Sequence, residues 1–258
     1  MQFLKLQEKI RKPLLGFVRM MYSLKLIKPW YTVTNPLKRY IIWQSPFFKS
    51  MNPDLVVDIG ANTGEFIISI QKIFPFTNLI AFEPVDDCYK QLKNHFGNKS
   101  NISLCNVALG SENKKGQIFV SDFSPSSSIV RPEGDYKLEE IEIRKLDEYL
   151  DVLKDHKKVF IKIDVEGFEL EVLKGADFFL QQSDWIYVES RILDPIGCSF
   201  KELYDHLTSR NWFFLGSYDN VFDNKGHMIY FDALFLNLDR NSLPKLLESA
   251  GIPGNRSK

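Results

Sequence analysis

Leu55-Val-Val-Asp-Ile-Gly-Ala-Asn-Thr-Gly-Glu-Phe-Ile-Ile-Ser-Ile70 is the stretch that decides the fold of this chain. It begins with a β-branched apolar run, which is typical of a strand buried on both faces. A short loop follows from Gly60 to Gly64, and apolar residues then resume at helical spacing after Glu65. A buried strand, a glycine-bounded loop and a helix predict the first βα unit of a doubly wound sheet. Ligands of such sheets bind outside the carboxyl ends of the strands.

The spacing of the glycines indicates which kind of ligand this loop binds. A dinucleotide fingerprint needs G-x-G-x-x-G so that the backbone can approach a pyrophosphate, whereas this loop reads Asp58-x-Gly60-x-x-x-Gly64. Asp58 would repel a phosphate but suits a cofactor with an amino group or a sulfonium, and the helix N-terminus can receive a carboxylate. S-adenosylmethionine carries all three groups. The same spacing also fits a purely structural βα turn, so further residues have to decide.

The composition of the 258-residue chain fits one large α/β domain, alone or with an appendage. Its 44% hydrophobic content supports a sizeable core and argues against general disorder. Three cysteines without C-x-x-C spacing favour a reducing compartment. No apolar run approaches the ~18–20 residues of a spanning helix, and the amino end does not resemble a secretory signal. These features predict a cytoplasmic protein.

The first fifty residues differ from the rest of the chain in charge. They hold ten basic groups against the single acid Glu8, a balance of +9, so the remainder carries −9. A helix that begins near Pro13 would place an apolar stripe from Leu14 to Leu24 on one face. We predict a basic amphipathic extension over residues 1–50 and a main domain over residues 51–258. The extension either lies on the inner face of a membrane, or packs on the domain or on a second subunit of a homodimer.

A second acid follows the next predicted strand, Asn78–Phe82. Glu83 comes 19 residues after Gly64, close to the separation at which an acid holds the hydroxyl pair of a ribose. The third predicted strand and its exit loop, Ile102–Gly110, would place Asn106 and Ala108 beside an adenine.

More acids follow the fourth and fifth predicted strands. An apolar strand ends at Asp164 and is followed by Glu166-Gly167, and Lys162 lies within the same run. This density of charge exceeds what a strand end needs. In the expected strand order the fourth strand lies beside the first, so Asp164 and Glu166 would face the Gly60 loop. Glu189 lies at the carboxyl end of the fifth strand, Trp185–Ser190.

The remaining predicted elements complete the domain. A helix capped by Asp86 or Asp87 follows Glu83, another stops at Gly175 as a C-terminal glycine, and Ser199 with Glu202 forms a capping box. Further strands are predicted at 117–121, 140–144, 212–215 and 229–236, with a hairpin between the last two and a short helix at 243–249. The polar loop at 123–129 either positions a substrate or is a plain surface loop.

Six motifs in order resemble the FkbM-type S-adenosylmethionine-dependent methyltransferases over roughly residues 52 to 236. They are Val57-Asp-Ile-Gly-Ala-Asn-Thr-Gly64, Phe82-Glu-Pro84, Asn106-Val-Ala-Leu-Gly110, Leu146-Asp-Glu-Tyr-Leu150, Ile161-Lys-Ile-Asp-Val-Glu-Gly-Phe-Glu169 and Val188-Glu-Ser190. The resemblance implies an α/β, Rossmann-like class I methyltransferase fold, with a seven-stranded, mostly parallel sheet of order 3-2-1-4-5-7-6 and an antiparallel strand 7. It also implies methyl transfer to oxygen, usually on sugars or polyketide-like metabolites.

These expectations assign roles to particular residues. The predicted cofactor-binding set is Asp58, Gly60, Asn62, Thr63, Gly64, Glu83, Asn106, Ala108 and Asp164. Asp164 would act as the base or orient the acceptor, with Glu166 and Glu189 shaping the acceptor pocket and Asp58 orienting the loop or the methionine amino group. No metal is assigned, although Asp164 and Glu166 could instead share a divalent cation with the acceptor oxygen.

Other readings of the sequence are open or disfavoured. A non-catalytic membrane-surface or assembly module would keep the sheet and the basic extension but would not need the acids. The missing glycine disfavours a nicotinamide dehydrogenase, and the acidic domain body argues against nucleic acid as a partner. Of the four histidines only His227, in the hairpin, is a candidate site residue. The loops at 121–136 and 190–199 are expected to select the small-molecule or glycan acceptor.

Overall fold

The computed structural model describes residues 45–120, 127–130, 136–192 and 197–241. The chain divides into two compact units, Met1–Ile41 and Ile42–Lys258, and all described residues belong to the second. The helix predicted near Pro13, most of the polar loop at 123–129 and the helix predicted at 243–249 lie outside the described residues.

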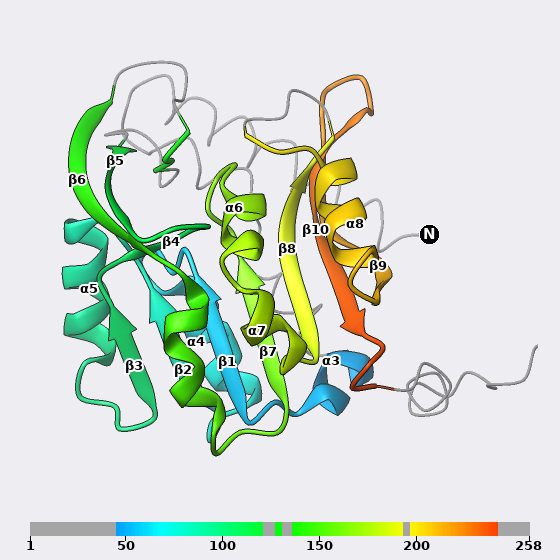
Figure 1. The fold of residues 1–258 in the computed structure, drawn as a ribbon, viewed down its shortest axis with the longest axis horizontal. Coiled ribbons are helices and arrows are strands. Elements are labelled where there is room, and N and C mark those ends of the chain that lie inside the picture. Colours follow the sequence, from blue (N-terminus) through cyan, green and yellow to red (C-terminus); the bar gives the residue numbers. More distant parts are fainter. Residues whose placement is uncertain (1–44, 121–126, 131–135, 193–196, 242–258) are drawn as a thin grey trace, which may run out of the picture. The chain divides into compact units, whose positions relative to one another are not determined.

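The centre of this unit is a seven-stranded sheet (Figure 1). Its strands are β1 (Leu55–Ile59), β2 (Asn78–Phe82), β3 (Ile102–Cys105), β7 (Val159–Ile163), β8 (Trp185–Arg191), β9 (Trp212–Phe222) and β10 (Met228–Asn237). They lie in the order β3-β2-β1-β7-β8-β10-β9. Neighbours from β3 to β8 pair in parallel, and β10 is antiparallel to β8 and β9. This is the order 3-2-1-4-5-7-6, so the predicted class I methyltransferase arrangement is confirmed.

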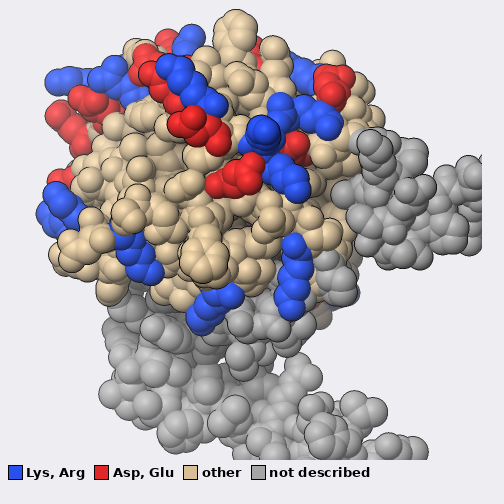
Figure 2. Space-filling model, turned by 90° about the horizontal axis from the view of Figure 1, so that it is seen from below, with Lys and Arg blue, Asp and Glu red and all other residues tan. Residues whose placement is uncertain are grey.

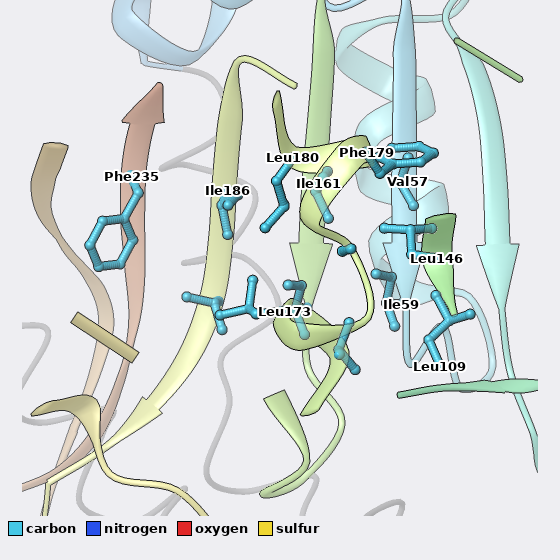
Figure 3. Close-up of a cluster of buried hydrophobic side chains, with 14 of the residues drawn as sticks. Val57, Ile59, Leu109, Leu146, Ile161, Leu173, Phe179, Leu180, Ile186 and Phe235 are labelled. Atoms are coloured by element: carbon cyan, nitrogen blue, oxygen red, sulfur yellow. The ribbon is translucent and has the colours of Figure 1, made fainter. Parts of the chain in front are cut away.

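β1 and β7 lie at the middle of the sheet because their sequences are mostly apolar on both faces. All five residues of each strand are buried. Val57 and Ile59 belong to a core cluster on one face (Figure 3), whereas Val56 belongs to a second cluster on the other. Full burial of such a side chain contributes about 1.5–3 kcal/mol. The central strands therefore give fixed positions to the loops that leave their carboxyl ends.

Helices cover both faces of the sheet (Figure 1). They are α3 (Pro46–Met51), α4 (Glu65–Ile73), α5 (Asp86–Phe96), the 3₁₀ helix η2 (Leu146–Leu153), α6 (Glu169–Lys174), α7 (Asp177–Gln181) and α8 (Phe200–Thr208). The predicted capping box at the start of α8 is confirmed, with Ser199 and Glu202 each accepting from the other's backbone N–H. In the described part of the chain no helix is long and apolar enough to cross a membrane.

A second, three-stranded sheet consists of β4 (Ala108–Leu109), β5 (Lys114–Val120) and β6 (Lys137–Arg144) in the order β4-β6-β5. The strands predicted at 117–121 and 140–144 are therefore present, and each begins three residues earlier than predicted. The predicted third strand is divided, because β3 ends at Cys105 and β4 then pairs in parallel with β6 instead. β4 thus joins the two sheets just after the third strand of the main sheet.

Two predicted helix ends are wrong in their details. Neither Asp86 nor Asp87 caps α5, whose N-cap is Val85 without a side-chain hydrogen bond. The backbone N–H of Val85 instead donates to Glu83 Oε1, and that of Asp86 donates to Glu139 Oε1.

Gly175 follows α6, but with a φ of −90° it is not the left-handed C-terminal glycine that was predicted. The glycine is needed there because a Cβ would lie 1.9 Å from the carbonyl oxygen of Gly110.

Candidate active site

The glycine loop lies against the end of β7 with no room for a side chain. Gly60 has a φ of +79°, and a Cβ built on it would lie 1.9 Å from the backbone oxygen of Asp164. The N–H groups of Gly60 and Ala61 donate to the carbonyl oxygen of Phe82, at 3.0 and 3.1 Å. The loop is therefore fixed between the carboxyl ends of β2 and β7. Sequence spacing predicted the glycine, and the structure gives the steric reason for it.

Gly64 closes the loop and precedes α4. It is the N-cap of that helix, with a φ of +91° and no side-chain cap. A Cβ at Gly64 would meet the Phe96 ring at 2.5 Å. α4 therefore begins without a side-chain cap, and a helix N-terminus favours an anionic group of a ligand.

Glu83 follows β2 and joins the glycine loop to the start of α5. Its Oε2 accepts from the N–H of Asn62 and its Oε1 from the N–H of Val85, both at 2.8 Å. The side chain is buried, and this desolvation raises the pKa of the Glu83 carboxyl to about 7 in spite of both hydrogen bonds. Glu83 thus has a structural role in addition to the predicted role at a ribose.

Asn106 and Ala108 lie next to this corner. Asn106 Nδ2 donates to the backbone oxygens of Glu83 and Pro84, at 3.0 and 3.1 Å, and so holds the turn after β2. Ala108 is buried in a small apolar cluster with Val85. Contact of either residue with an adenine stays a prediction, as does contact of Thr63 with a cofactor.

Asp58 is buried below the loop. Its side chain is fully enclosed, and Lys162 is its register partner on β7, with Nζ 3.3 Å from Asp58 Oδ1. Burial raises the pKa of the Asp58 carboxyl, while the charge of Lys162 lowers it. The described contacts of Asp58 are therefore with the protein interior, and contact with a methionine amino group stays a prediction.

Asp164, Glu166 and Glu189 are brought together as the sequence predicted. One carboxylate oxygen from each lies within 4.8 Å of the others. Arg191, two residues after Glu189 on β8, forms ion pairs with Glu166 and with Glu189 Oε1, the latter at 2.9 Å. Burial raises the pKa of Glu189 well above its ordinary value, and the charges of Asp164 and Glu166 add to this effect. The three acids and the arginine form one half-buried polar group at the ends of β7 and β8, which we call the acid cluster.

Three segments distant in sequence meet at the turn Glu166-Gly167 within this cluster. Ser128 Oγ donates to the backbone oxygen of Glu166 at 2.6 Å. A Cβ at Gly197 would lie 1.8 Å from the oxygen of Gly167, so the backbones are in close contact there. Ser128 and Gly197 lie in the two loops that were expected to select the acceptor. Both loops are therefore attached to the turn that carries Glu166.

The turn is also held from within by Glu169, which sequence reasoning did not identify. Its Oε1 accepts from the N–H groups of Val165 and Gly167, at 3.2 and 3.0 Å. Cys198 Sγ donates to Glu169 Oε2 at 3.6 Å. Burial raises the pKa of Glu169 to about 7. Lys162 and Glu169 are charged residues among apolar ones, and this is the feature of the sequence that indicates a role for them. For Arg191 the corresponding feature is its position two residues after Glu189.

A metal ion is possible at the acid cluster by ligand type, since three carboxylates could offer oxygens to a hard cation. Arg191, however, already supplies positive charge to two of these three acids. His227 lies apart from the cluster, in the hairpin that joins β9 and β10, where its Nδ1 pairs with Asp223 Oδ2 at 2.9 Å. That contact fixes the turn of the hairpin.

Residues 58–213 match a family model described as the methyltransferase FkbM domain. This span covers the glycine loop, Glu83 and the whole acid cluster. The chain belongs to the FkbM methyltransferase family.

Two curated proteins are similar to this FkbM family member. Methyltransferase sdnD of Sordaria araneosa is 28% identical over 176 residues, which cover 55% of this chain and 66% of the relative. The hexuronic acid methyltransferase AglP of Haloferax volcanii is 31% identical over 144 residues, 53% of this chain and 55% of that protein. The chain thus spans between half and two thirds of the length of these relatives.

Among solved structures, the methyltransferase FkbM of Methylobacillus flagellatus KT is similar, with a TM-score of 0.46 and 17% identity. The similarity covers 72% of this chain and 44% of that one.

Membership of the FkbM family implies S-adenosylmethionine as methyl donor, and the residues present fit it. Each Glu83 oxygen accepts one backbone N–H, and a carboxylate oxygen has a second lone pair for a ribose hydroxyl. The N-terminus of α4, without a side-chain cap, suits the methionine carboxylate. The backbone of Asp164 lies directly against Gly60, and its carboxylate would offer a negative charge to a sulfonium bound at this loop.

Proposed function

We propose that this chain transfers a methyl group from S-adenosylmethionine to a hydroxyl oxygen of a sugar, a glycan or a small metabolite. One observation carries the proposal. The glycine loop, Glu83 and the acid cluster lie at the carboxyl ends of β1, β2, β7 and β8, which are adjacent in the sheet. The groups proposed to bind the donor and the acceptor would therefore lie side by side, at the edge where doubly wound sheets bind ligands.

The charges of the acid cluster favour a hydroxyl acceptor over a carboxylate acceptor. Three acids meet there, and the guanidinium of Arg191 already pairs with two of them. A free carboxylate would be repelled by this arrangement, whereas a neutral hydroxyl would find several hydrogen-bond acceptors. The relative from Haloferax volcanii is named for hexuronic acid, which has hydroxyl groups as well as a carboxylate.

Methyl transfer to an alcohol needs alignment and the removal of one proton. The acceptor oxygen must approach the methyl carbon in line with the leaving sulfur, and groups on fixed strand ends favour such alignment. Asp164 is the proposed base or orienting group because it lies next to the Gly60 loop. Glu189, which pairs with Arg191 at 2.9 Å, would accept a hydrogen bond from a second hydroxyl of the acceptor.

The first test is calorimetric titration of the full chain with S-adenosylmethionine. We expect micromolar binding that is lost in Glu83→Ala and in Gly60→Val, because the first removes the ribose acceptor and the second fills the loop. Glu202→Ala is the matched control for Glu83, since Glu202 also accepts a backbone N–H near a helix start but lies at α8. Absence of binding by folded wild-type protein would contradict the proposal and favour a non-catalytic module.

A second test identifies the atom that is methylated. Protein is incubated with methyl-labelled S-adenosylmethionine and a panel of p-nitrophenyl hexosides and hexuronides. A methyl ether on a hydroxyl survives mild alkali, whereas a methyl ester on a carboxylate is hydrolysed. We expect alkali-stable label that is lost in Asp164→Asn. Label released by alkali would show transfer to a carboxylate and would contradict the hydroxyl assignment.

A further inference from the structure

Lys162 is a charged residue in the most buried part of the fold. It is the fourth residue of β7, between Ile161 and Ile163, and only 8% of it is exposed. Withdrawing an ammonium group from water is costly, and apolar residues of similar volume often replace a buried ion pair without loss of stability. A lysine in this place is therefore poorly explained by stability alone.

The ammonium group of Lys162 contacts three parts of the active site. Its Nζ donates to the backbone oxygen of Gly60 at 3.0 Å. It lies 3.3 Å from Asp58 Oδ1 and 3.4 Å from Asp164 Oδ2. It also lies 5.7 Å from the centre of the Phe66 ring on α4. One side chain thus joins the glycine loop, the core of β1 and the carboxyl end of β7.

We propose that Lys162 is a positioning residue that holds the glycine loop against Asp164 and sets the charge beside the methyl donor. The inference rests on the proposed function, because it assumes that the donor lies over this loop. Lys162 does not itself touch the reacting atoms in this proposal. It acts through Gly60, whose carbonyl it binds, and through Asp164, whose carboxylate it pairs with.

The backbone contacts make this coupling direct. The N–H of Asp164 donates to the oxygen of Ile59 at 3.0 Å, and Gly60 has no space for a Cβ beside the Asp164 oxygen. A shift of the loop would therefore move Asp164. A small misplacement of the reacting groups is enough to slow an in-line methyl transfer. Removal of Lys162 would free the Gly60 carbonyl and also leave Asp58 as a buried charge with its ion pair broken.

The test compares two ligands that differ in charge at sulfur. S-adenosylmethionine has a positive sulfonium, whereas S-adenosylhomocysteine has a neutral thioether. Calorimetry with the full chain measures Kd for both ligands in wild type, Lys162→Met, Lys162→Arg and the double variant Asp58→Asn/Lys162→Met. In the double variant, Asp58→Asn removes the buried charge that Lys162→Met alone would leave without its ion pair. The double variant is therefore expected to fold even if Lys162→Met does not. Lys158→Met, an exposed lysine directly before β7, is the matched control.

In Lys162→Met we expect affinity for S-adenosylhomocysteine to fall by about tenfold, the scale of one lost hydrogen bond to a charged group. S-adenosylmethionine should lose less, because a positive charge that repels the sulfonium is gone. The Kd ratio of S-adenosylhomocysteine to S-adenosylmethionine should then rise by about threefold or more. Lys162→Arg should keep the wild-type ratio. The double variant should return to that ratio but still bind both ligands weakly.

Two results would overturn the inference. Recovery of full affinity in the double variant would mean that Lys162 serves only to neutralise Asp58. Equal loss of both ligands in Lys162→Met would mean that its charge has no effect at the sulfur and that its role is structural. Failure of the proposed function gives a different result, since wild-type protein would then bind neither ligand before any variant is compared.

Discussion

At the scale of single residues, Glu169 links the stability of the fold to pH. An exposed Glu ionises near pH 4.5, whereas burial raises the pKa of Glu169 in the fold to about 7. Between these two values the folded chain binds more protons at this site than the unfolded chain. The contribution of Glu169 to stability is therefore greatest below about pH 4.5 and declines as the pH rises to about 7.

We expect Glu169→Gln to stabilise the protein at pH 8 and to have little effect at pH 5. Glutamine resembles the protonated acid, because its oxygen can accept from Val165 and Gly167 while no charge is buried. The gain in free energy of unfolding at pH 8 should reach about 3 kcal/mol, because the pKa of Glu169 rises by about 2.5 units on folding. Urea denaturation at both pH values measures it.

The control for this substitution is Glu140→Gln, at an exposed position on β6. It should change stability by less than about 0.5 kcal/mol at either pH. A loss of stability in Glu169→Gln at pH 8 would mean that the ionised carboxylate is what holds the turn.

At the scale of elements, the turn between β7 and α6 depends on loops that come from elsewhere in the chain. Ser128 Oγ donates to the Glu166 oxygen, and Glu166 has a φ of +53°, a conformation that non-glycine residues rarely adopt. The surrounding contacts offset the strain of this conformation. Loss of one such contact should therefore make this turn open locally more often.

We expect Ser128→Ala to increase amide hydrogen exchange in a peptide that covers residues 164–169. Loss of one hydrogen bond of about 0.5–1.5 kcal/mol corresponds to a two- to tenfold rise in the exchange rate. Ser69→Ala is a matched control, because Ser69 Oγ also donates to a backbone oxygen, that of Glu65 on α4, and lies far along the chain. Unchanged exchange in Ser128→Ala would show that Gly197 and Glu169 suffice to hold the turn.

The sequence predicted those parts of the site that depend on strand ends. Asp164, Glu166 and Glu189 were found because parallel strands bring their carboxyl ends to one edge. The sequence did not predict which side chains pair across elements. The cap of α5 shows why, since Asp86 donates to Glu139, which lies 53 residues away in the chain. Propensity favours a local cap, but a tertiary contact replaced it.

The contacts of Arg191 were missed for the same reason. Its ion pair with Glu166 joins the ends of two strands, and no local pattern specifies which of the nearby acids it selects. By contrast, the order of the seven strands was implied by the resemblance that the family motifs carry. Patterns along the chain thus predicted the arrangement of the strands. Contacts between distant segments determine which side chains pair with one another in the site.

At the scale of the whole molecule, charge is unevenly distributed. Figure 2 views the domain from below in the sense of Figure 1, on the side of the amino ends of the parallel strands. Acidic side chains lie in the upper half of this view, whereas Lys and Arg side chains are also present in the lower half. Phe76, which precedes β2, is 93% exposed. Residues 1–44 add nine basic groups against one acid.

We propose that residues 1–44 bind anionic membranes, and we expect sedimentation with phosphatidylserine liposomes to depend on them. Basic residues near such a surface contribute about 1 kcal/mol each at low salt. Deletion should stop before Ser45, because Phe48 and Met51 of α3 are packed in the core. Neutral liposomes provide the control, and equal sedimentation with and without residues 1–44 would contradict the proposal. If residues 1–44 instead hold a homodimer together, through an apolar stripe that a second subunit covers, their deletion should lower the mass measured in solution from that of a dimer to that of a monomer.

The pairing of β1 with β7 has a consequence for synthesis. Leu55 lies opposite Val159, so about a hundred residues follow β1 before its central partner leaves the ribosome. At a rate of roughly 5–20 residues per second, the nascent chain presents an unpaired, mostly apolar strand edge for several seconds. Such an edge can pair with other chains. Chaperones that bind extended apolar segments during translation should therefore affect the yield of this protein more than its final stability.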